Sequence, residues 1–410
     1  MIIVDLFSGA GGLTFGFYYK LINGDFVENK NNSFVFANEF DENAAKAFKI
    51  NYPHINMENC DIKELTDERI KELVGDKNVD LIIGGPPCQS FSTVGQRQFD
   101  DKAKLYTEYL RMISIIKPKI FVFENVKGLL SMREVFYKKD SDGNILYEYT
   151  NLENKTSKKP RKKPVVDHYG EKIMDIIKKQ FEELGYTIYH KLFNAVEFGV
   201  PENRERVFIV GVRNDVKIDQ KLKSPEKKPI LTIKDAISDL PIVGEGEEKT
   251  EYGDDPHNPY QKLMRGNCER ITQHYCGEYG VKIRTVIEHV RQGEGKNNFN
   301  ELVDAGEVSE EYRLTSGYAN TYGRLVENQP SPTITNNMTT PSALRCIHYS
   351  QNRALTPREG ARIQSFPDWY QFVGKKEHVT KQIGNAVPPL LAISLADQIE
   401  QILKEAADNE

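Results

Sequence analysis

Short apolar runs alternate with helical patterns through the first third of the chain, and this alternation constrains the fold more than any other feature. Runs rich in Val, Ile and Phe, bounded by Gly, Asp or Pro, indicate buried strands. Strands separated by helices predict βαβ units and a parallel sheet with helices on both faces. The expected strands are residues 2–7, 33–37, 79–83 and 120–123, and the expected helices are residues 42–51, 66–74 and 106–116.

This rhythm lapses after Glu134. Residues 135–167 are polar and rich in Lys and Asp, so we interpret them as a surface insertion. A helix at 171–184 and two strands at 187–193 and 206–212 are then expected to resume the α/β fold.

A second, irregular domain is expected from about residue 215, because Gly, Pro, Asn and charged residues separate short segments as far as residue 355. Helical patterns return at 356–364 and 384–403, and we expect the last helix, 389–403, to pack on the first sheet. The predicted division is a large discontinuous domain at 1–215 and 372–410 and a small domain at 216–371.

Composition sets limits on the setting of this chain. The start of the sequence, MIIVD, has no basic segment and no small-residue cleavage site, and no apolar run approaches the ~20 residues of a membrane span. We therefore expect a cytoplasmic protein without membrane contact. Five cysteines without paired short spacing favour reduced thiols over disulfides or a metal site. The net charge of -5 argues weakly against a nucleic-acid partner, whereas the basic run at 155–163 allows local contact with phosphates.

A glycine-rich turn follows the first strand. The sequence DLFSGAGG at residues 5–12 lets a ligand approach the backbone closely, with Phe7, Gly9 and Gly11 at the turn. Thr14 stands where a dinucleotide motif has its third glycine, so a nucleoside other than a nicotinamide dinucleotide is favoured. A purely structural turn is the alternative interpretation.

Acidic residues follow the next two expected strands. Glu39 is suited to accept from both ribose hydroxyls, Phe40 to stack on a purine, and Asp61 to accept from an exocyclic amine. An acid at a strand end is more often a helix cap than a ligand. Three successive strand ends with this chemistry favour a nucleoside-binding edge.

Cys88 follows the fourth expected strand in the sequence GGPPCQSFS at 84–92. Two prolines fix the backbone before it, at the carboxyl edge where open α/β sheets place their ligands. A buried, inert cysteine is the usual alternative, but this loop of Gly, Pro, Gln and Ser supplies no apolar cover. We therefore predict a nucleophile.

Glu124 ends the neighbouring strand, where burial is expected to raise its pKa so that it holds or donates a proton beside Cys88. Arg204 and Arg206 precede a later strand and share one face if the chain is extended there. Surface salt bridges are the alternative for both arginines.

Together these residues resemble the DNA (cytosine-5) methyltransferase family, of the prokaryotic restriction-modification type. The resemblance covers nearly all of the chain except 135–167 and the body of the second domain. Its motifs occur in the order of the family: DLFSGAGG at 5–12, NEF at 38–40, CD at 60–61, GGPPCQSFS at 84–92, ENV at 124–126, ENRERVF at 202–208, LTPREGARIQSFPD at 355–368 and IGNAVPP at 383–389.

The resemblance implies that Cys88 attacks C6 of a flipped-out cytosine in double-stranded DNA, that Glu124 holds the base at N3 and its amino group, and that Arg206 contacts the base oxygen. Arg204 is expected to support the loop or a phosphate. Residues 90–104 are the expected lid.

The family also implies S-adenosyl-L-methionine as cofactor and the Rossmann-like fold of S-adenosylmethionine-dependent methyltransferases: a mixed, mostly parallel sheet with helices on both faces, plus a smaller irregular target-recognition domain. The expected cofactor-binding residues are Phe7, Gly9, Gly11, Glu39, Phe40, Asp61, Ile62, Pro86, Leu105, Asn385 and Val387. No metal site is implied.

Two positions depart from the pattern of the family. Glu202 stands where the family commonly has Gln, and this change is expected to weaken a polar contact near the loop. Lys102-Ala103 replaces an Arg-Gly pair at the end of the mobile loop, which puts details of loop closure in question.

Other functions remain open from sequence alone. A tRNA cytosine-5 methyltransferase shares the PPC and ENV elements, but it lacks a large recognition domain. A catalytically silent DNA-binding regulator is expected to have lost Cys88 or Glu124. An amino-group methyltransferase needs no cysteine, and a nicotinamide dehydrogenase is disfavoured by the glycine spacing.

The second domain is expected to set the base sequence that is recognised, since Arg pairs well with guanine and Asn with adenine in the major groove. Residue types alone do not give the register in the groove, so no recognition sequence is predicted, and most of the candidates are expected to be surface or structural residues. The candidates are Arg265, Asn267, Arg270, His274, Arg313, Tyr318, Asn320 and Arg324.

The resemblance also implies a prokaryotic, nucleoid-associated monomer that modifies the site of a cognate restriction endonuclease without a stable complex. An orphan or phage-borne enzyme has the same sequence features.

Overall fold

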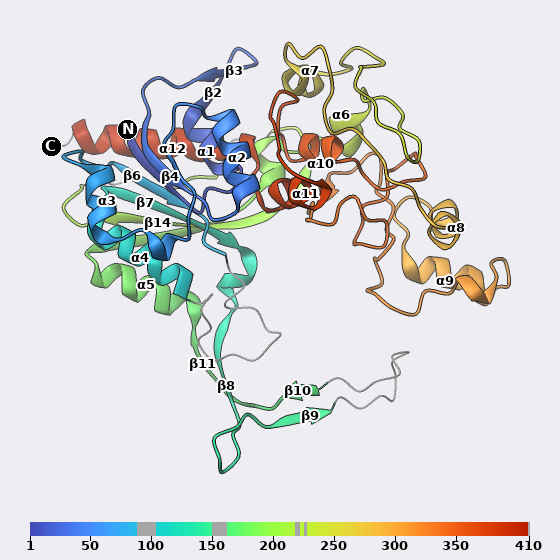
Figure 1. Cartoon of the computed structure of the whole chain (residues 1–410), viewed down its shortest axis with the longest axis horizontal. Coiled ribbons are helices and arrows are strands. Elements are labelled where there is room, and N and C mark those ends of the chain that lie inside the picture. Colours follow the sequence, from blue (N-terminus) through green and yellow to red (C-terminus); the bar gives the residue numbers. More distant parts are fainter. Residues whose placement is uncertain (88–103, 150–161, 218–221, 225–227, 409–410) are drawn as a thin grey trace.

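A seven-stranded sheet forms the centre of the computed structural model, which describes residues 1–87, 104–149, 162–217, 222–224 and 228–408 (Figure 1). β14 runs antiparallel to both of its neighbours, β12 and β7, and all other neighbouring strands in the sheet are parallel. The predicted α/β fold with a mixed, mostly parallel sheet is confirmed. In spatial order the strands are β12 (Tyr186–Asn194), β14 (Glu205–Arg213), β7 (Ile120–Val126), β6 (Leu81–Gly84), β1 (Ile2–Leu6), β4 (Ser33–Asn38) and β5 (Met57–Glu58).

Helices cover both faces of this sheet because successive side chains of each buried strand point to opposite sides. In β7, Ile120 and Val122 enter one hydrophobic cluster, and Phe121 and Phe123 enter the other. The first cluster packs under α1 (Gly12–Tyr18), α2 (Glu42–Asn51) and α12 (Pro389–Asp408). The second packs under α3 (Asp67–Val74), α4 (Lys104–Ile116) and α5 (Ile173–Glu183).

Local sequence signals account for the ends of several helices. α2 has the predicted bounds, because the carboxylate of Asp41 accepts from the backbone N–H groups of Asn43 and Ala44. Thr66 caps α3 in the same way through the N–H of Arg69. α12 begins at Pro389, the predicted start of the last helix, and ends at Asp408, beyond the predicted residue 403. α11 (Lys376–Asn385) was not predicted.

The second region is a set of short helices joined by irregular chain, as its sequence predicts. Buried ion pairs hold it together: Arg362 lies 2.8 Å from Asp239 and 2.7 Å from Asp368, and Arg353 lies 2.6 Å from Glu359. A separate small cluster around Val286 and Phe299 forms its outer part. Its elements are α6 (Ile233–Ile237), α7 (Pro259–Arg265), α8 (Val281–His289), α9 (Lys296–Asp304), η5 (Glu310–Tyr312), β15 (Ser331–Pro332) and α10 (Pro357–Ile363).

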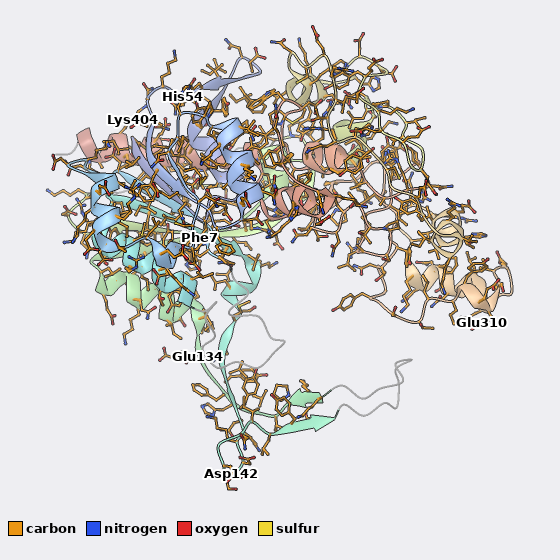
Figure 2. All side chains as sticks on the ribbon, in the orientation of Figure 1. Phe7, His54, Glu134, Asp142, Glu310 and Lys404 are labelled. Carbon is orange, nitrogen blue, oxygen red and sulfur yellow. The ribbon has the colours of Figure 1, made fainter. Side chains whose placement is uncertain are left out.

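Residues 133–149 and 162–172, which we call the arm, form two antiparallel ribbons, in agreement with the surface insertion predicted at 135–167. β8 (Arg133–Tyr137) pairs with β11 (Val166–Lys172), and β9 (Tyr147–Tyr149) pairs with β10 (Lys162–Pro164). The arm projects from the body below α5 (Figure 1), and Figure 2 shows Glu134 at its base and Asp142 at its far turn. Most of the basic run at 155–163 lies outside the described residues.

The remaining small elements complete the body. They are β2 (Tyr19–Ile22), β3 (Asp25–Glu28), β13 (Glu202–Asn203) and the short helices η1 (Ile62–Glu64), η3 (Lys127–Leu130) and η4 (Ala195–Phe198). Throughout the part of the chain that the structure describes, no helix has both the length and the apolar character of a membrane span.

The last helix packs on the body as predicted, and Gly16 sets how closely it does so. α1 and α12 are in contact along their length. A Cβ on Gly16 would collide with the backbone of Ala392. Because backbone cannot move aside as a side chain tip can, only glycine permits this approach.

We expect Gly16→Ala to lower the free energy of unfolding by about 2 kcal/mol, since overpacking against backbone outweighs the helix propensity gained. Urea denaturation followed by circular dichroism measures the change. Gly253→Ala is the control, because Gly253 is exposed and its added Cβ meets its nearest neighbour at an ordinary 3.8 Å. Equal stability of the two variants would contradict this account of the contact.

Candidate active site

Glu124 and Arg206 form an ion pair at the carboxyl edge of the sheet. They lie on the adjacent strands β7 and β14, with Nε of Arg206 3.0 Å from Oε1 of Glu124, and each side chain is 13% exposed. Burial raises the pKa of Glu124, although the charges of Arg206 and Arg204 oppose that effect. The raised pKa that the sequence predicts for Glu124 is therefore confirmed, and its carboxyl group is able to hold a proton.

The loop that follows β6 is fixed against this pair. Nδ2 of Asn125 donates to the carbonyl of Pro86 at 3.1 Å, and a Cβ on Gly85 would lie 2.8 Å from Oε2 of Glu124. The sequence motif GGPP therefore runs directly past the Glu124 carboxyl group. Cys88 and the expected lid at 90–103 lie outside the described residues; Lys104 begins α4.

Arg204 was expected to support the loop or a phosphate, and its burial contradicts the second of these alternatives. Its side chain is fully buried, and its guanidinium donates to the carbonyls of Ile334 at 3.1 Å and Gly384 at 2.7 Å. Burial lowers the pKa of Arg204 to about 10. Arg204 instead joins the edge of the sheet to the second region and to the end of α11.

Glu202 lies beside Arg204 and is also fully buried. Its Oε1 accepts from the N–H of Ile334 at 2.6 Å and lies 3.6 Å from Arg204, whereas its Oε2 has no partner among the described residues. Burial raises the pKa of Glu202. Glu202, at a position where the family commonly has Gln, thus supports the same junction with Ile334 of the second region as Arg204 does.

The glycine turn presents open backbone next to an acid. Phe7, Gly9 and Gly11 all have positive φ, at 55°, 57° and 97°, and a Cβ on Gly9 would meet nothing within 4 Å. Oε2 of Glu39 accepts from the N–H of Gly9 at 2.8 Å. This combination fits a nucleoside, because a ribose can approach the bare backbone and the carboxylate together.

Glu39 and Phe40 flank this opening. Oε1 of Glu39 accepts from the N–H of Asp41 at 2.8 Å, and burial raises the pKa of Glu39 against the effect of these backbone donors. The Phe40 side chain is 74% exposed and leaves an aromatic face available. Phe40 is therefore placed as a stacking residue requires.

Other predicted cofactor residues gather at the same edge. The carbonyl of Val387 would lie 2.6 Å from a Cβ on Gly12, so the turn of Asn385 and Val387 covers the glycine turn. Asp61 caps η1 through the N–H of Lys63 at 3.1 Å, and Ile62 is buried behind it. Phe7 and Leu105 both pack, half-buried, against the cluster below α4.

Several side chains that support the glycine turn were not predicted. The hydroxyl of Tyr52 donates to the carbonyl of Gly11 at 2.7 Å, and that of Tyr370 donates to the carbonyl of Ala10. Thr14, noted in the sequence only as a break in the glycine spacing, donates to Asp5. Burial raises the pKa of Asp5 to about 8. The strand-end Asp5 was a visible signal, whereas nothing local to either tyrosine indicates its contact.

A hollow of about 530 Å³ opens beside Arg206. It lies at the start of β14, where β7, β13 and the second region meet. The residues that line it carry amide, hydroxyl and charged groups, which are suited to a polar polymer. They are Val126, Lys127, Gly128, Asn194, Asn203, Glu205, Arg206 and Thr333.

Two candidate base contacts in the second region are structural. Arg324 is 8% exposed and donates to carbonyls that include those of Val290 and His348. His274 is fully buried between Thr356 and Pro241. For these two residues the structural alternative, which the sequence favoured for most candidates, is confirmed.

The other candidates differ in exposure and in ion pairing. Arg265 pairs with Asp239 at 2.7 Å, and Arg313 pairs with Asp304 at 2.6 Å. Asn267, Arg270 and Tyr318 are exposed, and Asn320 is half-buried beside Arg345.

Comparison with known proteins agrees with this geometry. The family described as C-5 cytosine-specific DNA methylase matches residues 1–141 and 163–401. The type II methyltransferase M.DdeI of Desulfomicrobium norvegicum is 33% identical over 97% of this chain and 88% of its own length. M.AgeI of Thalassovita gelatinovora is 31% identical over 97% of this chain and 98% of its own length.

Solved structures share the fold. A protein of an E. coli prophage described as a DNA modification methyltransferase aligns with a TM-score of 0.68 at 24% identity, over 98% of this chain and 99% of that one. DNMT2 of Spodoptera frugiperda aligns with a TM-score of 0.56 at 15% identity, over 97% and 99%.

The chain belongs to the C-5 cytosine-specific DNA methylase family. It is a DNA (cytosine-5) methyltransferase, and S-adenosylmethionine is its methyl donor. The Rossmann-like fold that the resemblance implies is confirmed.

We expect Glu202→Gln to gain stability relative to the wild type as the pH rises. Because its pKa is raised, folded Glu202 keeps a proton that the unfolded chain releases above about 4.5, so the wild type loses up to about 1.4 kcal/mol per pH unit across that window. Denaturant unfolding at pH 5, 6, 7 and 8 measures the difference. Exposed Glu288→Gln is the control, and a difference independent of pH would contradict the assignment.

Proposed function

We propose that this methyltransferase flips one specific cytosine out of double-stranded DNA and attacks it through Cys88. One observation carries the proposal: Asn125 fixes the carbonyl of Pro86 beside the buried pair of Glu124 and Arg206. Two peptide units separate Pro86 from Cys88, so a Cys88 thiolate works next to a carboxyl group that is able to hold a proton.

Each side chain has a distinct chemical part. The sulfur of Cys88 forms a bond to C6, and Glu124 holds the base at N3 and its amino group, which draws electron density away from the ring and favours attack. Arg206 contacts the base oxygen and keeps Glu124 in place. S-adenosylmethionine, when bound, supplies the methyl group to C5. Loss of the C5 proton returns an electron pair to the ring, and the bond between sulfur and C6 breaks.

The base must leave the helix because C5 and C6 are stacked inside the duplex. Extrusion costs a few kcal/mol of stacking and pairing, which new contacts in the protein have to offset. The polar hollow beside Arg206 offers such contacts. Residues 90–104 are proposed as the lid over the flipped base.

For the cofactor we propose that Glu39 accepts from the ribose and that Phe40 stacks on the adenine. Asp61 accepts from the exocyclic amine, and the glycine turn receives the remainder of the molecule. The full proposed set is Phe7, Gly9, Gly11, Glu39, Phe40, Asp61, Ile62, Pro86, Leu105, Asn385 and Val387.

The biological setting is also a proposal. Relatives named as type II methyltransferases support a modification enzyme of a restriction-modification system, acting as a monomer on the site of a cognate endonuclease without a stable complex. Residues 1–215 and 372–410 are proposed to form the catalytic domain, and residues 216–371 the target-recognition domain.

We expect Glu39→Gln to weaken S-adenosylmethionine binding about 10- to 100-fold, since it removes charge-assisted hydrogen bonds. Phe40→Ala should weaken it about tenfold by loss of stacking. Isothermal titration calorimetry of the free enzyme measures both. The exposed Glu42→Gln is the matched control, and wild-type affinity in both test variants would refute the proposed cofactor site.

We expect a duplex that contains 5-fluorocytosine to trap the enzyme covalently in the presence of S-adenosylmethionine, because fluorine does not leave as a cation. Denaturing electrophoresis and peptide mapping should place the adduct on Cys88. Cys88→Ser should abolish it while DNA binding remains, and Glu124→Gln should slow methyl transfer by at least about 100-fold.

Cys268→Ser is the control for loss of an unrelated thiol. An adduct on another residue, or a Cys88→Ser enzyme near the wild-type rate, would overturn the mechanism. An adduct formed only with fluorinated RNA would move the substrate assignment to RNA.

A further inference from the structure

The arm has no core of its own. Among its described residues, 133–148 and 162–172, every side chain is exposed or half-buried. A two-stranded ribbon without a packed face is marginally stable in water. A partner that covered the arm would supply the packed face that it lacks.

Four lysines lie in the outer part of the arm. Lys138 and Lys139 follow β8, Lys162 and Lys163 begin β10, and no ion pair joins any of them to another described residue. The ammonium group of Lys162 lies 4.3 Å above the ring of Tyr147. We call these four lysines the lysine set.

Acids in the same part of the chain only partly offset the lysine set. Asp140 accepts from the backbone N–H groups of Asp142 and Asn144 at the far turn, where Asp142 is exposed. Glu148 in β9 lies opposite Lys163. The described outer part, residues 138–148 and 162–165, therefore holds four lysines and three acids, a net charge of +1.

The base of the arm lies at the reacting edge of the sheet. β7 carries Glu124 and continues through η3 directly into β8, so few residues separate the catalytic carboxyl group from the arm. In Figure 1, β9 and β10 turn toward the side on which α8 and α9 of the second region lie. The arm and the second region thus extend from the body on either side of that edge.

We propose that the arm is a second DNA-binding element, whose lysine set contacts phosphates of the duplex beside the target cytosine. This inference rests on the proposed function, since that function places the target at the edge where the arm begins. Unpaired lysines on a narrow ribbon fit a polyanion better than they fit a second copy of this chain, whose net charge is only -5. Antiparallel ribbons also match the width of a DNA groove.

The test compares a variant with all four lysines of the set changed to Gln against a control with the same loss of charge. The control changes Lys30, Lys49, Lys71 and Lys77, which are exposed on the body. The target sequence is first read by bisulfite sequencing of methylated plasmid. Binding is then measured by fluorescence anisotropy with two duplexes, one limited to the target and one extended on both sides, at several salt concentrations.

We expect the arm variant to bind the long duplex at least about tenfold more weakly than the wild type does. The slope of log affinity against log salt concentration should become shallower by the equivalent of about two to four phosphate contacts. Binding of the short duplex and its methylation rate should match the wild type, which shows that the variant is folded. The control variant should match the wild type on both duplexes.

Equal affinity and equal salt dependence of the arm variant and the wild type on the long duplex would overturn the proposal. So would an equal loss in the control variant, or a change in oligomeric state of the arm variant in analytical ultracentrifugation. Failure of the proposed function gives a different result, namely no methylated cytosine with the wild type.

Discussion

One buried guanidinium, that of Arg204, connects three distant parts of the chain. It reaches from the edge of the sheet to the carbonyl of Ile334 in the second region and to that of Gly384 before the last helix. A buried cation that lost these acceptors would cost about 3–5 kcal/mol. The relative placement of β14, the second region and the end of α11 therefore depends on this contact.

Electrostatics at the site follow from the same construction. Burial raises the pKa of both Glu124 and Glu202. Each carboxyl group lies beside an arginine whose charge opposes that effect. The two pairs differ in exposure: Arg206 and Glu124 keep contact with solvent, whereas Arg204 and Glu202 do not. One pair is thus available to a substrate, and the other maintains the frame around it.

The sequence predicted what local patterns encode. The central strands, α2, the strand-end acids and the raised pKa of Glu124 all follow from short-range periodicity, caps and burial. The contacts of Tyr52, Tyr370 and Arg204 join residues far apart in the chain, which no local pattern indicates.

The candidates in the second region show the same limit. Arg324 and His274 have the residue types of base contacts, but only the folded chain shows that their polar atoms bind backbone and hydroxyl groups inside the protein. The arm was expected as an insertion, yet its ribbons depend on pairing between β8 and β11, whose strands lack the apolar alternation of a sheet with a core.

The cover over the glycine turn has a consequence for biosynthesis. The ribosome makes Gly12 before it makes Val387, whose carbonyl packs over that glycine. Until then the first βα unit lacks both that backbone and the helix that packs on Gly16. A nascent chain therefore carries the glycine turn uncovered until residues 385–408 have been synthesised.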